Sequence, residues 1–222
     1  NHPNHRLRFR NVAWEGDTVY EQWRDVNFGA WQEQLAWLKA TVLVVQFGQM
    51  ESLDGRKKLG EFVKAYEALL DQFEKQTKQI VLVSPMPFEK PKAKAAPNLL
   101  DRNEDLALYA REVRLIAKRR NVLYVDLQSL RDTPGITRDG IHLTTEAHSV
   151  VDELIATKLG VPSSPGIAIE GLRELIQEKN RLWFDYWRPM NYAFAFGDRM
   201  HVAFGRGDPT LRDELDALRP IL

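Results

Sequence analysis

The chain of 222 residues is long enough to bury a core, and its 44% hydrophobic and 28% charged residues are typical of a soluble globular protein. Its 31 lysines and arginines balance its 31 aspartates and glutamates, so no global charge favours nucleic acid or an anionic membrane as a partner. The absence of cysteine excludes disulfides and thiol nucleophiles, and no apolar run reaches the ~18 residues that would span a bilayer.

The hydrophobic pattern predicts strands and helices in alternation. An alternating segment at 7–12 predicts a half-exposed strand near a sheet edge, and the β-branched run at 41–47 predicts a strand buried on both faces. A further buried strand is expected at 80–83, and another strand at 122–126. Helices are expected at about 29–39, 56–76 and 101–119, and after Thr144 or Thr145 as the N-cap. This order predicts an α/β fold with a parallel sheet and helices on both faces.

Three loops are expected to meet at one end of this sheet. Ligands of such sheets bind outside the carboxyl ends of the strands. The turn at Gly16, the loop at 48–52 and the loop at 139–142 all lie at that end. The combination of the three is more informative than any one of them.

A longer, proline-rich loop at 84–98 carries Lys90, Lys92 and Lys94. Polar loops of this length are usually solvated, so we expect a solvated rim around the ligand site. A substrate lid is the alternative.

A helical, aromatic-rich extension is expected at 161–222, after an α/β domain at 1–160. Proline and glycine at 161–166 predict a linker, followed by a helix at about 168–180. The aromatic residues at 183–187 are too dense for a free tail, so we expect them to pack on the domain or a partner chain, with carbohydrate stacking as the alternative. Asp208 is expected to cap the last helix, with Pro209 at its first position.

Asp139 and His142 form the motif with the clearest chemical meaning. An acid three residues before a histidine can hold the imidazole in one tautomer and stabilise its charged form. Gly140 would let the backbone turn so that both side chains face one side. Taken alone, the pair is better explained as a surface histidine in a loop salt bridge, and only the other loops favour the catalytic interpretation. The sequence has no glycine-rich phosphate loop and no metal-ligand spacing among its five histidines, so no cofactor or metal is predicted.

Three blocks of sequence resemble the SGNH or GDSL-like hydrolases, a family of esterases and lipases. The blocks are Asn11-Val-Ala-Trp-Glu-Gly16-Asp-Thr, Gly48-Gln-Met-Glu51 and Asp139-Gly-Ile-His142. The resemblance covers about residues 7–160 and implies a three-layer, flavodoxin-like sheet. The segment around 179–191 is similar to the C-terminal extension of a bacterial subgroup whose members are often exported, which implies a periplasmic or secreted location.

The resemblance also implies a mechanism and a class of substrate. A serine in a Gly-Asp-Ser turn would attack a small-molecule or carbohydrate ester, with carbohydrate acetyl esters as one possibility. His142 would act as the general base and Asp139 would orient it. The backbone N–H of Gly16 would help to stabilise the oxyanion. No oligomeric state is implied.

The first departure from the family is the nucleophile. No Gly-Asp-Ser block precedes Asn11, so we expect the chain to be a truncated piece of a longer protein with little serine-dependent turnover by itself. A sheet without its central strand would also expose unpaired backbone and apolar faces. Ser52 and Ser84 follow buried strands, but neither lies on a glycine-flanked elbow, so neither is expected to replace the missing serine.

The second departure is Met50, which stands where the family has its oxyanion asparagine. A thioether cannot donate a hydrogen bond. Gln49 could supply an amide instead, and local packing is the expected role of Met50. Met50 and the aromatic C-terminal segment motivate a second hypothesis, a catalytically degenerate binding or interaction module. An unrelated flavodoxin-like ligand-binding domain is a third, although no anion site supports it.

Overall fold

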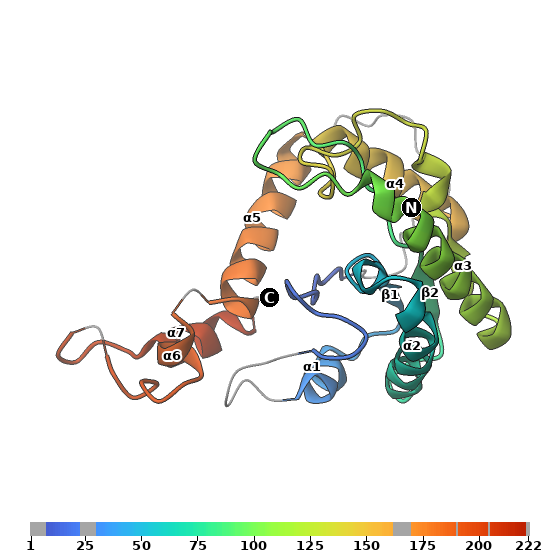
Figure 1. Ribbon diagram of the computed structural model, residues 1–222. Coiled ribbons are helices and arrows are strands. Elements are labelled where there is room, and N and C mark those ends of the chain that lie inside the picture. The colour runs from blue at the N-terminus through green and yellow to red at the C-terminus, as the bar shows by residue number, and fades with distance from the viewer. Residues whose placement is uncertain (1–7, 23–29, 162–169, 190, 204, 221–222) are drawn as a thin grey trace. The chain divides into compact units, whose positions relative to one another are not determined.

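The structure, a computed structural model, describes residues 8–22, 30–161, 170–189, 191–203 and 205–220 (Figure 1). The chain forms two compact units. The first comprises Asn1–Glu15, Trp23–Glu33 and Ser164–Leu222, and the second comprises Gly16–Gln22 and Gln34–Ser163. The predicted domain boundary near residue 160 remains a prediction.

The second unit is built on a parallel three-stranded sheet in the order β1-β2-β3. Its strands are β1 (Leu43–Gln46), β2 (Ile80–Val83) and β3 (Leu123–Val125). The central strand β2 is buried along its whole length and has a neighbouring strand on each edge. The predicted α/β class and parallel sheet are confirmed.

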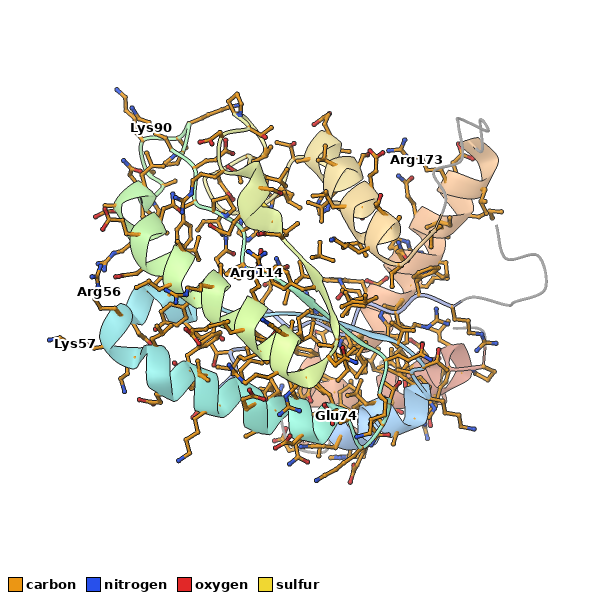
Figure 2. The ribbon with its side chains drawn as sticks, turned by 90° about the vertical axis from the view of Figure 1, so that its right-hand side faces the viewer. Arg56, Lys57, Glu74, Lys90, Arg114 and Arg173 are labelled. Atoms are coloured by element: carbon orange, nitrogen blue, oxygen red, sulfur yellow. The ribbon has the colours of Figure 1, made fainter. Side chains whose placement is uncertain are left out.

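Helices cover both faces of this sheet (Figures 1 and 2). On one face, Val81 and Val83 of β2 join a core cluster with Ala147 and Val151 of α4 (Thr145–Lys158). On the other face, α2 (Leu59–Phe73) and α3 (Asn103–Arg120) pack together, and the ring centroids of Phe62 and Tyr109 lie 4.8 Å apart. Successive strand residues point to opposite faces, so one apolar strand supplies both layers.

The helices begin and end close to the predicted positions. α1 spans Trp31–Leu38 and buries Leu35. Short 3₁₀ turns precede or link the longer elements, at Glu51–Asp54, Arg56–Lys58, Leu100–Arg102 and Leu127–Leu130. Thr144 caps α4 by accepting a hydrogen bond from the backbone N–H of Ala147, as one of the two predicted caps would. No helix in the described ranges is long and apolar enough to cross a membrane.

The strand predicted at 7–12 is wrong. Residues 8–15 form neither helix nor strand apart from a turn that begins at residue 15. Their backbone is satisfied by side chains instead: the indole of Trp183 donates to the carbonyl of Asn11 at 2.7 Å, and Arg188 donates to the carbonyl of Ala13. Alternation indicates a preference for a half-buried extended chain, but a strand also needs a neighbouring strand to pair with.

The prediction for β1 was only partly correct. Val45 is buried, but the side chain of Val44 is 52% exposed, so the strand is not buried on both faces. β1 lies at an edge of the sheet as the described residues form it. An apolar run predicts that its side chains are buried, but it does not specify which neighbouring element covers them.

In the first unit, α5 (Glu170–Trp187) extends well beyond the predicted end at residue 180. It runs through the aromatic cluster, so Trp183, Tyr186 and Trp187 lie on one helical face and are buried. Trp183 and Trp187 stack with centroids 5.5 Å apart. The expectation that the cluster packs against protein is confirmed, and its contacts include the segment at 8–15. Most of the predicted linker lies outside the described residues.

The last helices are α6 (Tyr192–Ala195) and α7 (Leu211–Leu218). The predicted cap of the last helix is wrong, because Thr210, not Asp208, occupies that position. Thr210 and Asp213 exchange hydrogen bonds in a capping box. Satisfying two backbone N–H groups at once outweighs the proline preference on which the prediction relied.

Candidate active site

The 139–142 loop is a tight turn closed by backbone hydrogen bonds. The N–H of Arg138 donates to the carbonyl of His142 at 2.9 Å, and Thr137 forms an antiparallel bridge with Leu143. The N–H of Thr144 donates to the carbonyl of Ile136 at 2.9 Å, just before α4 begins. The loop is therefore fixed at both ends and leads directly into a helix.

Asp139 holds His142 through both carboxylate oxygens. Oδ1 accepts the backbone N–H groups of Ile141 at 3.0 Å and His142 at 2.8 Å. Oδ2 lies 2.8 Å from Nδ1 of the His142 imidazole. The backbone N–H and the imidazole of His142 hold the pKa of Asp139 well below its usual range. An ionised carboxylate can only accept, so Nδ1 carries the proton and Nε2 is left as the basic nitrogen.

This arrangement fits a base and its orienter. The His142 side chain is 63% exposed, so a reacting group can approach the imidazole. The structure brings Asp139 and His142 together as the sequence predicted. A surface ion pair would have the same contacts, so the catalytic roles remain a prediction.

Gly140 is required for two reasons, only one of which the sequence suggested. Its φ of +97° lies in the left-handed region that favours glycine. A Cβ at this position would also lie 2.7 Å from the carbonyl oxygen of Glu89. The turn thus depends on close approach by a neighbouring loop as well as on backbone freedom.

Glu51 connects the residue just after the first sequence block to the second block. Its carboxylate accepts the N–H of Val19 at Oε1 and the N–H of Gly48 at Oε2, both at 2.8 Å. The side chain is buried, and that burial raises the pKa of Glu51 even though the N–H donors oppose the rise. The segment after Gly16 and the loop after β1 are therefore joined through one carboxylate. Sequence reasoning aligned Glu51 with the family block but did not predict this contact.

Gly16 lies in an exposed turn with a φ of +85°, three residues before Val19. The turn itself was predicted correctly. Hydrogen bonds join Asp139 to His142, and they join the segment after Gly16 to the Gly48 loop. The role of the Gly16 N–H as an oxyanion donor remains a prediction.

Met50 does not pack as expected. It is 53% exposed in the turn before the 3₁₀ segment Glu51–Asp54, so the packing prediction is wrong. Neighbouring Gln49 uses its side-chain amide to donate to the carbonyl of Met86 at 3.1 Å. The amide that could have replaced the family asparagine therefore has a structural partner.

Ser52 and Ser84 are both fully buried and hydrogen-bonded. The hydroxyl of Ser52 donates to the carbonyl of Gln49 at 2.7 Å, and the hydroxyl of Ser84 accepts the N–H of Leu127 at 2.8 Å. A nucleophile must be reachable by substrate. Their burial supports the expectation that neither serine is the nucleophile.

The loop at 84–98 divides into two parts. Residues 84–88 are buried, contrary to the expected solvated rim, because Met86 and Phe88 pack into the core. Lys90, Lys92 and Lys94 are exposed as expected, and Figure 2 shows Lys90 projecting outward. In the ranges that the structure describes, no group of three or more His, Asp or Glu side chains could hold a metal ion.

Comparison with known proteins places this chain in a family. The model of the GDSL-like Lipase/Acylhydrolase family matches residues 2–150. No curated protein matches the chain.

Solved structures with a similar fold include two hydrolases. One is LAE5, an alpha/beta hydrolase from the metagenome of Lake Arreo, Spain, with 19% identity, a TM-score of 0.47, and coverage of 60% of this chain and 66% of that one. The other is Axe2, an acetylxylan esterase from Geobacillus stearothermophilus, with 20% identity, a TM-score of 0.46, and coverage of 60% and 67%. The chain spans about two-thirds of the length of these structures. Since the family match extends over more than half of the chain, the protein belongs to the GDSL-like Lipase/Acylhydrolase family.

Proposed function

We propose that this chain carries the base and its orienter for a serine-dependent ester hydrolase. The observation that supports the proposal is the Asp139–His142 geometry, with Oδ2 2.8 Å from Nδ1, inside the region that matches the family. The substrate would be a small-molecule or carbohydrate ester, carbohydrate acetyl esters among them. The nucleophile would come from the Gly-Asp-Ser turn that the family resemblance implies.

The proposed reaction moves one proton through His142. The serine oxygen attacks the ester carbonyl carbon while its proton passes to Nε2, and Asp139 stabilises the resulting imidazolium. The imidazolium then protonates the leaving alkoxide, which gives an alcohol and an acyl-enzyme. Water repeats the sequence on the acyl-enzyme, releasing the acid and restoring the serine. The backbone N–H of Gly16 would donate to the oxyanion in both halves.

The first test uses the 222-residue chain. We expect no fluorophosphonate labelling and no p-nitrophenyl acetate hydrolysis above background, because the two serines that follow strands, Ser52 and Ser84, are buried and no Gly-Asp-Ser turn is present in this sequence. Labelling mapped to either serine would contradict the proposed source of the nucleophile.

The second test uses the reading frame upstream of this sequence. If a Gly-Asp-Ser turn is encoded there, His142→Ala in the longer protein should lower kcat by about 10²–10⁴-fold. His148→Ala is the matched control, since His148 is an exposed histidine in α4. Equal kcat values for the two variants would overturn the role of His142.

Met50 favours a second candidate, a catalytically degenerate binding module. It stands where the family resemblance puts the oxyanion asparagine, a thioether cannot donate a hydrogen bond, and the amide of Gln49 donates elsewhere. An upstream turn whose serine is replaced would favour this candidate.

In a serine-bearing protein, Met50→Asn should raise the rate on p-nitrophenyl acetate by about 10²–10³-fold. Met50→Leu, which changes shape without adding a donor, is the control. No gain from Met50→Asn would mean that Met50 does not limit catalysis.

A further inference from the structure

Residues 84–89, here called the hub segment, follow β2 and are supported by side-chain amides from β1, from the loop after β1 and from the 3₁₀ turn at Leu127–Leu130. The carbonyls of three successive hub residues each accept one glutamine N–H. The pairs are Gln46 to Ser84 at 3.0 Å, Gln128 to Pro85 at 2.8 Å and Gln49 to Met86 at 3.1 Å. Buried backbone that belongs to no sheet or helix needs such partners. The hub segment is therefore a supported part of the core.

The end of the hub segment is clamped to α3. Asn103, the first residue of α3, accepts the N–H of Phe88 and donates to the carbonyl of Phe88, both at 2.9 Å. One carboxamide thus fixes both backbone groups of the residue before Glu89. Because both backbone groups of Phe88 are held, the backbone of the following residue, Glu89, is also held in a defined position.

Glu89 connects this clamp to the loop that carries Asp139 and His142; the pair is here called the dyad, and its loop the dyad loop. Its Oε1 accepts the N–H of Gly135 at 2.7 Å, and its Oε2 accepts the N–H and the hydroxyl of Thr137 at 2.5 and 2.6 Å. Its own N–H donates to the carbonyl of Gly140 at 3.0 Å. The hydroxyl of Thr137 in turn accepts the N–H of Gly140 at 3.1 Å. Glu89 therefore holds the residues on both sides of Arg138 and Asp139.

The electrostatics agree with this geometry. Partial burial raises the pKa of Glu89, but the hydrogen bonds from Thr137 and Gly135 outweigh it and leave the pKa below its usual value. The carboxylate is thus the favoured form. Arg138, which lies between Thr137 and Asp139 in the chain, has its Nε 3.7 Å from Oδ2 of Asp139.

We propose that Glu89 is a positioning residue, which holds the 135–140 backbone so that Asp139 can fix the tautomer and direction of the His142 imidazole. The inference rests on the proposed function, since it assigns Glu89 to the same site. A carboxylate is needed because three donors converge on its two oxygens. In Glu89→Gln, the NH₂ group would face at least one of those donors, so an isosteric change should loosen the loop.

The test measures the His142 imidazole by NMR in the 222-residue chain. Long-range ¹⁵N–¹H spectra report which ring nitrogen carries the proton at a pH where the ring is neutral. The parent protein should show the Nδ1–H tautomer at His142. Glu89→Gln should shift His142 towards the tautomer mixture of an unpaired histidine. Asp139→Asn, which removes the carboxylate, gives the reference spectrum for complete loss of the pair.

Lys90→Gln is the matched control, because Lys90 follows Glu89 and is exposed. It should leave the His142 spectrum unchanged. Glu89→Asp, which keeps the charge but shortens the side chain, should restore part of the Nδ1–H tautomer.

Thr137→Val keeps the inference testable if Glu89→Gln fails to fold. It removes the hydroxyl between Glu89 and Gly140 but leaves the Gly135 contact, so a partial shift of the His142 tautomer is expected. Folded Glu89→Gln or Thr137→Val protein with an unchanged His142 spectrum would overturn the proposal and leave Glu89 a purely structural brace. No readout depends on ester hydrolysis, so failure of the proposed function and failure of this inference are distinguishable.

Discussion

Three carboxylates shape the loops of the candidate site by accepting backbone N–H groups. Asp139 orders its own loop, Glu51 joins two loops, and Glu89 joins the hub segment to the dyad loop. A carboxylate suits this role because it has two oxygens with about four acceptor positions and no donor to conflict with an N–H. Hydrogen bonds to a charged acceptor are also stronger than neutral ones. Changes to these residues should therefore alter loop geometry as well as charge.

The titration of Asp139 tests the dyad directly. The N–H groups and the imidazole of His142 lower the pKa of Asp139, so its midpoint should lie below the ~3.9 of an unperturbed aspartate. The stability that this group contributes is present above that value and is lost as pH falls through the folded pKa. Carboxyl ¹³C shifts measured by NMR would give the midpoint.

His142→Ala should raise the Asp139 midpoint only in part, since the backbone N–H of residue 142 remains. His148→Ala should leave it unchanged. An Asp139 midpoint at ~3.9 in the parent protein would refute the ion pair.

Replacement of Glu51 by glutamine should destabilise the fold. A carboxamide can accept only one of the two N–H groups of Val19 and Gly48, and the other becomes a buried donor without a partner. We expect a loss of about 1–3 kcal/mol in the free energy of unfolding at pH 7, measured by urea denaturation. Glu153→Gln, at an exposed position in α4, should change it by less than about 0.5 kcal/mol.

At the scale of elements, rigid supports fix the loops of the site. The dyad loop leads into α4 through the Thr144 cap, and the hub segment is clamped by the first residue of α3. Helices and strands thereby hold loop residues that have no regular structure of their own. Catalytic groups are often placed on loops supported in this way.

Gly140→Ala should be more damaging than an ordinary glycine substitution. Both Gly140 and Gly160 have positive φ, but only at Gly140 would the new Cβ meet a backbone atom, the carbonyl oxygen of Glu89 at 2.7 Å. Gly160→Ala therefore measures only the free-energy cost of placing an alanine at a positive φ. We expect Gly140→Ala to cost roughly 1–3 kcal/mol more in the free energy of unfolding, by urea denaturation. Equal losses would mean that the close approach of the two loops is unimportant.

The aromatic face of α5 gives a prediction for the first unit. Trp183 is 3% exposed and its indole donates to Asn11, whereas Phe184 is 51% exposed. Trp183→Ala should lower the free energy of unfolding by about 3–5 kcal/mol, because it removes a large buried ring. Phe184→Ala is the control and should cost much less. Unfolding followed by circular dichroism would detect both changes, and similar losses would argue against the helical face described here.

At the scale of the whole molecule, the sheet has a buried centre and an exposed edge. Val44 of β1 and Val81 of β2 are direct partners in the parallel register, yet Val44 is 52% exposed and Val81 only 1%. The hydrophobic contribution of a side chain depends on the apolar area removed from water. The two valines therefore contribute very differently to stability despite adjacent positions in one sheet.

Threonine substitution at these two positions should reveal that difference. Val81→Thr places a hydroxyl in the core and should cost about 1–3 kcal/mol in the free energy of unfolding. Val44→Thr should cost less than about 0.5 kcal/mol, since water already reaches this side chain. Urea denaturation of both variants provides the measurement. A loss at Val44 equal to that at Val81 would mean that another part of the protein covers the β1 edge.

The local sequence pattern was sufficient to predict those features that depend on interactions between residues close together in the chain. The β2 strand, the three long helices of the second unit and the Asp139–His142 pair could be predicted because periodicity, capping residues and a three-residue spacing are local properties. The strand at 7–12 could not, because its alternation gave no information on whether a neighbouring strand was available. The cap at Thr210 was missed because the prediction relied on the proline signal, which the capping box outweighs.

The sequence by itself determined the fold class, the family and the identity of the candidate base and orienter. Only the tertiary structure decided which side chains hold that pair in place. Glu89 lies 50 residues before Asp139, and Glu51 lies 32 residues after Val19, so no local pattern could connect them. These contacts exist because parallel strands bring distant loops to the same end of the sheet, where one carboxylate can satisfy N–H groups from several of them.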